Sequence, residues 1–169
     1  MPMGRKPSNA DVEGLAATVD LPGGTERPSI EAARRRLGGR AHVPSRRAPG
    51  SLVQVRLLGS ERTKGVLLWA FDRHCDVWFA DGVARRADVH AITPCVGPTP
   101  AALLCVAGEI RLFASLAEGE SVRWQRGAEL AEGCIVEKCR YGAIIVSRDG
   151  RVVAVGFRKL WPVVVRGVA

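Results

Sequence analysis

The sequence predicts an all-β protein with two tandem small barrels, a short linker helix and an N-terminal arm that is mostly disordered or locally helical. Three observations predict this class: an internal repeat, apolar residues that alternate with a period of two, and an arm without aromatic residues. The expected units are an arm over residues 1–50, a first barrel over 51–96, a linker over 97–118 and a second barrel over 119–165.

The repeat aligns segment 65–94 with segment 133–162 at one constant offset, without a gap. Only four of the thirty aligned positions are identical, but apolar positions align with apolar positions along most of the length. Such a repeat indicates two copies of one supersecondary unit. Two unrelated β-meanders with shared turn chemistry are the alternative. The identical pairs are Gly65 and Gly133, Asp81 and Asp149, Gly82 and Gly150, and Pro94 and Pro162.

Short strands are expected throughout both copies, because β-branched, aromatic and aliphatic residues alternate with polar ones. The Asp-Gly pairs at 81–82 and 149–150 are strong hairpin signals. The expected strands are 52–58, 64–71, 76–80 and 83–92 in the first copy, and 121–125, 133–138, 143–147 and 151–161 in the second.

The linker carries the signals of one short helix. Thr99 is placed to cap it, Pro100 fits the first helical position, and Gly108 is placed to end it, so we expect a helix over 101–107. Residues 110–116 either extend this helix or form an extra strand.

The arm carries nine basic and five acidic residues among many Gly, Pro and Ser residues. This composition buries too little apolar surface to offset the entropy of ordering. Two short helices are expected within it, at Ser8–Val19 and at Ile30–Leu37, the second ended by Gly38. Because the second helix carries an arginine triplet, it either becomes ordered on a partner or remains a solvated tail.

Three strings of the first copy, 65–68, 75–82 and 87–92, resemble a Tudor domain, a member of the SH3-like barrels. The resemblance covers about residues 52–95 and, more weakly, 119–163. It implies binding of methylated lysine or arginine in an aromatic cage, or of nucleic acid or a plain peptide. By position, Phe79 and Asp81 match the cage aromatic and its acidic partner. Val53, Val55 and Leu57 stand where the first-strand aromatic is expected, and Ser147 replaces the third-strand aromatic of the second copy.

Several aromatic residues lie on expected strands, where they are either core residues or walls of a groove for a peptide or cation. Trp124 has an arginine on one side, an arrangement that suits base stacking or an interdomain contact. The candidate groove residues are Trp69, Phe79, Asp81, Trp124 and Tyr141.

The chain is strongly basic, with a net charge of +8. Such a chain attracts polyanions, and arginine binds phosphate in a two-point geometry. The candidate polyanion-binding residues are Arg34, Arg35, Arg36, Arg85, Arg86, Arg123, Lys138, Arg140, Arg158 and Lys159.

Catalytic and metal motifs are missing from the sequence. We find no glycine-rich phosphate loop, paired carboxylate motif or histidine ligand set, so we expect no enzyme and no cofactor. The five cysteines form no Cys-x-x-Cys pair, and Cys134 and Cys139 are interpreted as small core residues. No apolar stretch approaches a membrane span, so we expect a soluble intracellular protein without a membrane partner.

These features predict a non-catalytic binding or adaptor protein whose barrels and basic arm bind nucleic acid, DNA or RNA, or a protein peptide that is possibly methylated. A structural subunit of a protein or ribonucleoprotein assembly is the main alternative. An enzyme whose site is not visible in the sequence is the third. The sequence leaves the oligomeric state open.

Overall fold

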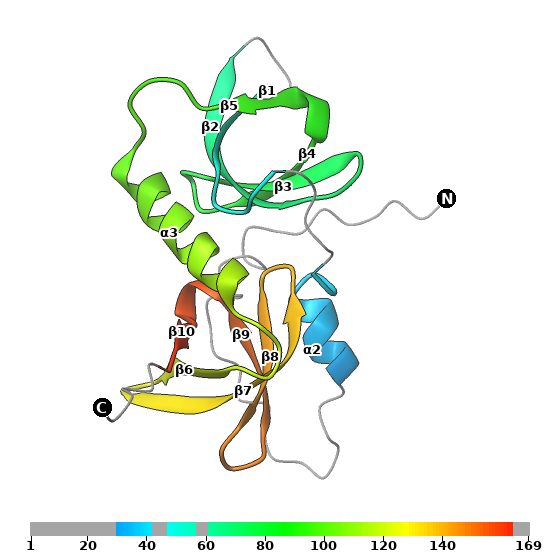
Figure 1. Cartoon of the computed structure of the whole chain (residues 1–169), viewed down its shortest axis with the longest axis vertical. Coiled ribbons are helices and arrows are strands. Elements are labelled where there is room, and N and C mark those ends of the chain that lie inside the picture. The colour runs from blue at the N-terminus through cyan, green and yellow to red at the C-terminus, as the bar shows by residue number, and fades with distance from the viewer. Residues whose placement is uncertain (1–29, 42–46, 57–60, 164–169) are drawn as a thin grey trace, which may run out of the picture.

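Two five-stranded antiparallel sheets form the body of the protein, one from each copy of the repeat. The computed structural model describes residues 30–41, 47–56 and 61–163. The strand order is β4-β3-β2-β1-β5 in the first sheet and β10-β6-β7-β8-β9 in the second. Both sheets curl (Figure 1), and they are termed the first and second barrel below. The all-β fold class is confirmed.

The expected strands are present, although β2 and β7 begin earlier than expected, at Arg62 and Glu129, and one further change occurs in both copies. The segments expected as single strands over 83–92 and 151–161 each divide into a strand, a 3-10 turn and a second strand. In the first copy the carboxylate of Asp88 accepts a hydrogen bond from the backbone N–H of His90, which starts the turn. The first barrel comprises β1 (Leu52–Arg56), β2 (Arg62–Ala70), β3 (His74–Phe79), β4 (Ala84–Asp88), η1 (Val89–Ala91) and β5 (Ile92–Pro94). The second comprises β6 (Ser121–Arg126), β7 (Glu129–Cys139), β8 (Gly142–Ser147), β9 (Val152–Gly156), η2 (Phe157–Lys159) and β10 (Trp161–Pro162).

The two barrels share one strand register. Gly65 pairs with Phe79, and at the equivalent point of the second copy Gly133 pairs with Ser147. The β2–β3 and β7–β8 ladders shift register at equivalent points, and the next ladder of each barrel also pairs equivalent residues throughout. The two copies therefore have the same fold, as the repeat predicts.

The repeated glycine of β2 and β7 lies where each barrel has no room for a side chain. A Cβ atom on Gly65 would lie 2.5 Å from a methyl group of Val77 and 2.8 Å from the carbonyl oxygen of Trp78. A Cβ atom on Gly133 would lie 2.8 Å from Ile145 and would also collide with backbone atoms of β8. The close approach explains why this position keeps its identity while most others have diverged.

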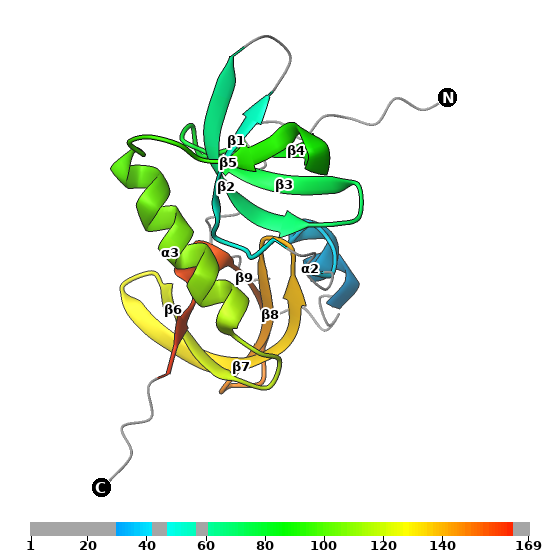
Figure 2. The same ribbon diagram turned by 45° about the horizontal axis from the view of Figure 1, so that its top comes forward.

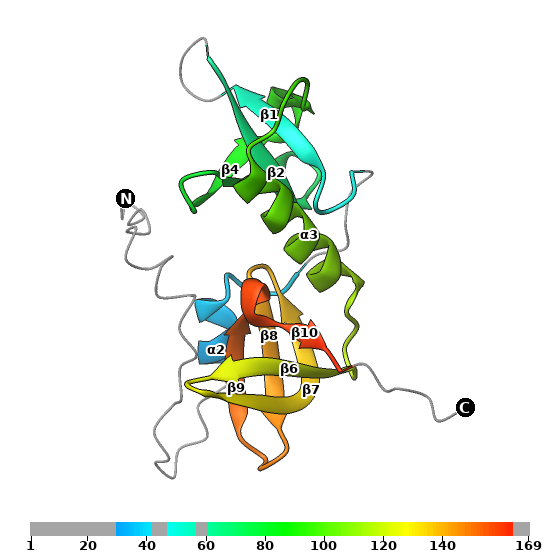
Figure 3. The ribbon, with the colours of Figure 1, turned by 90° about the vertical axis from the view of Figure 1, so that its left-hand side faces the viewer.

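Helix α3 (Ala101–Ser115) joins the barrels into one packed unit. Figures 2 and 3 show it running between them. The interior of the second barrel, the buried face of α3 and the outer face of β2 form one apolar cluster, whereas the interior of the first barrel forms its own. From Gly65 onward, strand β2 is therefore buried on both faces. The ring of Phe113 lies 6.1 Å, centroid to centroid, from both Trp69 of β2 and Phe157 of η2.

The linker helix extends into residues 110–116, as one of the two alternatives predicts. It starts at Ala101 as expected, but it runs past Gly108 to Ser115, because Ile110 and Phe113 continue its buried stripe. The extra strand considered for 110–116 is therefore wrong. Thr99 does not cap the helix, since Pro100 takes the cap position and forms no side-chain hydrogen bond there.

The second helix expected in the arm is confirmed as α2 (Ile30–Arg36). It ends at Gly38, whose φ of 80° is left-handed, and the N–H of Gly39 donates to the carbonyl of Arg34. The helix packs against the second barrel, so this part of the arm is ordered on its own chain. The helix expected over Ser8–Val19 lies outside the described residues.

Candidate functional site

The aromatic residues proposed for a ligand groove are mostly core residues. Trp69, Phe79 and Trp124 are 5%, 2% and 1% exposed. Phe79 fills the first barrel and Trp124 the second, while Trp69 packs between the barrels. A buried ring presents no face to a ligand, so the structure does not bring these residues together as an open cage.

Asp81 is exposed at the hairpin turn, where it binds its own neighbours. It accepts hydrogen bonds from the guanidinium of Arg85 and the backbone N–H of Val83. The bond from Arg85 lowers the pKa of the Asp81 carboxyl. The guanidinium of Arg85 also lies 5.2 Å from the centre of the Phe79 ring. This ion pair closes the turn. Arg85 therefore binds the carboxylate that an aromatic cage would use for a cationic ligand.

A polar cluster fills the junction between the barrels. Asp76 of β3, 2% exposed, lies 3.5 Å from Nε of Arg86 and 3.8 Å from Nε of Arg140 in the second barrel. Burial and the Asp76 charge raise the pKa of the neighbouring Tyr141 to about 12. Trp69 donates its indole N–H to the carbonyl of Arg140. Arg140 and Tyr141 therefore join the second barrel to Asp76 of the first, whereas Arg86 pairs with Asp76 within the first barrel.

Lys138 binds the C-terminal end of α3. Its ammonium nitrogen donates to the carbonyls of Ala114 and Leu116 at 3.0 and 2.6 Å. These are C-terminal carbonyls of α3, where a positive charge is favourable. Burial lowers the pKa of Lys138. The lysine predicted to bind polyanions thus caps the helix between the barrels.

The other predicted cationic residues occupy paired, half-buried or exposed positions. Arg34 donates to Glu137, and Arg158 donates to Glu109 at 2.7 Å. Arg123 is half-buried, and its Nε atom has no hydrogen-bond partner among the described residues. Lys159 is half-buried, and Arg35 and Arg36 are exposed on α2.

The outer end of the β1–β2 ladder holds a like-charge pair that the sequence reasoning missed. Arg56 and Arg62 lie directly opposite each other on the two strands, and both are exposed. No acidic side chain of the described residues forms an ion pair with either one. Glu61 precedes Arg62, and successive side chains of a strand point to opposite faces. Directly opposed like charges are destabilising, so the fold gains nothing from this pair.

Lys64 extends this basic face along β2. It lies opposite Gln54 of β1, two positions from Arg62 and therefore on the same face of the strand. Its ammonium nitrogen donates to the carbonyl of Pro98, which fixes it to the linker. The three cations Arg56, Arg62 and Lys64 are termed the basic face of the first barrel.

The equivalent ladder of the second barrel lacks this like-charge pair. Gln125 lies opposite Leu130 at the position of Arg56 and Arg62, and Arg123 lies opposite Glu132 at the position of Gln54 and Lys64. Arg126 lies opposite Glu129 one pair further along. Glu132 also forms a 2.5 Å ion pair with Arg148. The cations of the basic face are therefore not repeated in the second barrel.

The sequence could have revealed the basic face through its strand boundaries. The second strand was expected to begin at Lys64, which left Arg62 in a loop. Extending that strand by two residues would have placed Arg62 opposite Arg56.

No protein-family model matches this chain, and no curated protein matches it either. Among the described residues, no group of three or more His, Cys, Asp or Glu side chains could hold a metal ion. No helix in the described part of the chain has the length and apolar character to cross a membrane. Cys139 is a buried core residue as expected, but the interpretation of Cys134 as a core residue is wrong, because it is exposed.

Proposed function

We propose that this is a non-catalytic nucleic-acid-binding protein that contacts the phosphate backbone through the basic face of the first barrel. The observation that carries the proposal is the Arg56–Arg62 pair, two exposed cations held side by side without an acidic partner among the described residues. A phosphate between them would remove their repulsion and bind two guanidinium groups.

The barrel gives this pair a rigid base. Val53 and Val55 of β1 are buried in the first barrel, and alternation along the strand places Arg56 on the outer face. Cations held on a strand lose less freedom on binding than cations on a loop, which favours affinity. Arg35 and Arg36 of α2 add exposed positive charge elsewhere on the molecule.

Reading of methylated lysine or arginine is not part of this proposal. The matching cage aromatic, Phe79, is only 2% exposed, and Asp81 is paired with Arg85. The resemblance to Tudor domains therefore supports the barrel architecture of the proposal, while the ligand is inferred from charge.

The proposal is tested by the salt dependence of binding to duplex DNA and to single-stranded RNA. Each lost phosphate contact lowers the slope of log K against log salt by about 0.9 for a duplex and about 0.7 for a single strand. Arg56→Gln/Arg62→Gln is expected to lower the duplex slope by about 1.8. The control, Arg148→Gln/Arg151→Gln, removes the same charge from arginines already paired with Glu132 and Asp149. Equal slopes for the two double variants would refute the proposal.

An assembly subunit is the second candidate function. The outer face of the second barrel exposes 63% of Leu130 and 39% of Trp161. Exposed large apolar groups are typical of protein contacts. Sedimentation velocity separates the functions: unchanged monomer mass together with salt-dependent nucleic-acid binding supports the first, and self-association without nucleic-acid binding supports the second.

A further inference from the structure

A short helix of the arm lies on the outer face of the second barrel. Helix α2 has seven residues, too few to be stable alone in water. Its buried side chains, Ala33 and Leu37, are 4% and 1% exposed. They pack with Cys139, Ile144 and Ala154 in a small cluster separate from the barrel interiors. Contacts with this face therefore hold the helix in place.

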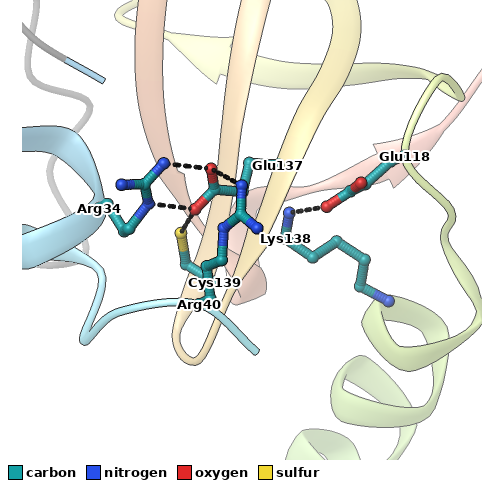
Figure 4. Close-up of polar contacts among 6 residues, drawn as sticks. All are labelled: Arg34, Arg40, Glu118, Glu137, Lys138 and Cys139. Atoms are coloured by element: carbon teal, nitrogen blue, oxygen red, sulfur yellow. Dashed lines mark hydrogen bonds and ion pairs between the residues drawn. The ribbon is translucent and has the colours of Figure 1, made fainter. Parts of the chain in front are cut away.

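A buried carboxylate anchors the helix beside this apolar cluster. Glu137 of β7 is 4% exposed and accepts two hydrogen bonds from the guanidinium of Arg34, at 2.6 and 2.7 Å (Figure 4). Arg40 approaches the same carboxylate at 3.4 Å. Two parallel N–H···O bonds are specific to arginine, since lysine cannot form them. The bond from Arg34 lowers the pKa of Glu137.

The backbone after the helix is bound as well. Residues 37–41 run along the turn between β7 and β8. The N–H of Ala41 donates to the carbonyl of Lys138, and the N–H groups of Arg140 and Tyr141 donate to the carbonyls of Gly39 and Leu37. The binding face thus combines an apolar cluster, an acidic anchor and a short run of backbone hydrogen bonds.

The same face of the first barrel shows that the barrel fold does not require these groups. At the equivalent positions of the first copy, Trp69 stands in place of Glu137, and Asp76 in place of Ile144. There Trp69 packs against Phe113 of α3, so an apolar contact replaces the ion pair of the second barrel. Glu137 is a buried carboxylate on an otherwise apolar face. It therefore serves to bind α2 and is not needed to form the sheet.

We propose that this face of the second barrel is a binding site for short arginine-bearing helical peptides and that α2 occupies it in the free protein. The peptide class has a small residue, then arginine, then leucine three positions later, followed by glycines, as at Ala33, Arg34, Leu37, Gly38 and Gly39. A partner of this chemistry replaces α2 by making the same contacts. The inference does not depend on nucleic-acid binding.

The test uses the full chain and a labelled synthetic peptide with the sequence of residues 29–41. Because α2 is tethered, its effective concentration is about millimolar, and it should outcompete the free peptide on the unmodified protein. The variant Arg34→Ala/Leu37→Ala releases α2 and should bind the peptide at least about tenfold more tightly than the unmodified protein. Adding Glu137→Gln should remove most of that gain. A peptide with lysine at the Arg34 position should bind at least about tenfold more weakly than the original.

Hydrogen exchange on the unmodified protein gives a second measurement that needs no variant. Excess unlabelled peptide should speed the exchange of backbone amides in residues 33–39 and leave those of β1–β5 unchanged. Absence of peptide binding by a folded Arg34→Ala/Leu37→Ala variant, together with unchanged exchange in residues 33–39, would overturn the proposal. Peptide binding that persists after Glu137→Gln would also overturn it, because the peptide would then bind elsewhere.

Discussion

The first and second barrels have the same strand register but different outer faces. Val53 pairs with Gly65, and Val122 pairs with Gly133 at the equivalent point. Three pairs further along, at an outward position, the first barrel has Arg56 opposite Arg62 and the second has Gln125 opposite Leu130. Inward positions therefore preserve the fold, while outward positions have diverged and determine what each barrel contacts.

The helices that cover the outer faces also differ between the two barrels. From Val66 onward the outer face of β2 is apolar and is covered by α3, whereas α2 covers the outer face around Glu137 of the second barrel. At the junction, Asp76 of the first barrel meets Arg140 of the second. A duplicated fold has thus acquired two different sets of partners within one chain, and changes at equivalent positions should have different effects.

The largest effect is expected from Phe113→Ala, which removes the ring that contacts both barrels. Phe113 is 1% exposed, and burial of a ring of this size predicts a loss of about 3–5 kcal/mol in the free energy of unfolding. Urea unfolding monitored by tryptophan fluorescence measures it. Leu104→Ala on the same helix is the control, because that side chain is 51% exposed and should cost less than about 0.5 kcal/mol. Similar losses for both variants would show that α3 does not join the barrels.

The repeated glycine should be required in both barrels. Gly65→Ala and Gly133→Ala should each cost about 1–3 kcal/mol, because the new methyl group overlaps the facing strand. The second should cost more, since it meets backbone atoms of β8 that cannot rotate away. Thermal unfolding measures both. Gly108→Ala in α3 has open space and should stabilise by about 0.4–1 kcal/mol. A neutral Gly133→Ala would contradict the close approach of β7 and β8.

The helix covering the second barrel should loosen in acid. The pKa of Glu137 is lowered in the folded protein, so its contribution is present above the ordinary carboxyl pKa of about 4.3 and is lost as the pH falls through the lower folded value. Methyl NMR signals of Leu37 followed from pH 6 to pH 3 should report this change. In Glu137→Gln the same titration should be flat, and an unchanged titration there would remove Glu137 as its cause.

The smallest effects are expected at the opposed charges of the two hairpins. Arg62→Glu converts the like pair of the first barrel into an opposite pair and should raise stability by about 0.2–1 kcal/mol. Glu129→Arg makes the reverse change in the second barrel and should lower stability by a similar amount. Urea midpoints measure both. Destabilisation by Arg62→Glu would mean that Arg62 has a structural role in the first barrel.

The strands and turns that occur in both copies could be predicted from the sequence, whereas the contacts between the copies could not. The Asp-Gly turns and the alternating strands follow from local chemistry, so the strands and the repeated fold were predictable. The positions of Trp69 and Phe113 were not, because they depend on packing between segments far apart in the chain. The same reason explains the predicted sites: Lys138 and Arg140 read as free cations until the fold brings them to α3 and Asp76.

Moving the like-charge pair without changing the net charge tests the central claim most directly. The variant Arg62→Glu/Glu129→Arg keeps the charge of +8 but places opposite charges on the first barrel and like charges on the second. If the first barrel binds nucleic acid, the affinity for duplex DNA at fixed salt should fall at least about tenfold, with a smaller salt slope. Unchanged affinity and slope would show that binding follows net charge alone and would contradict the assignment of nucleic-acid binding to the basic face of the first barrel.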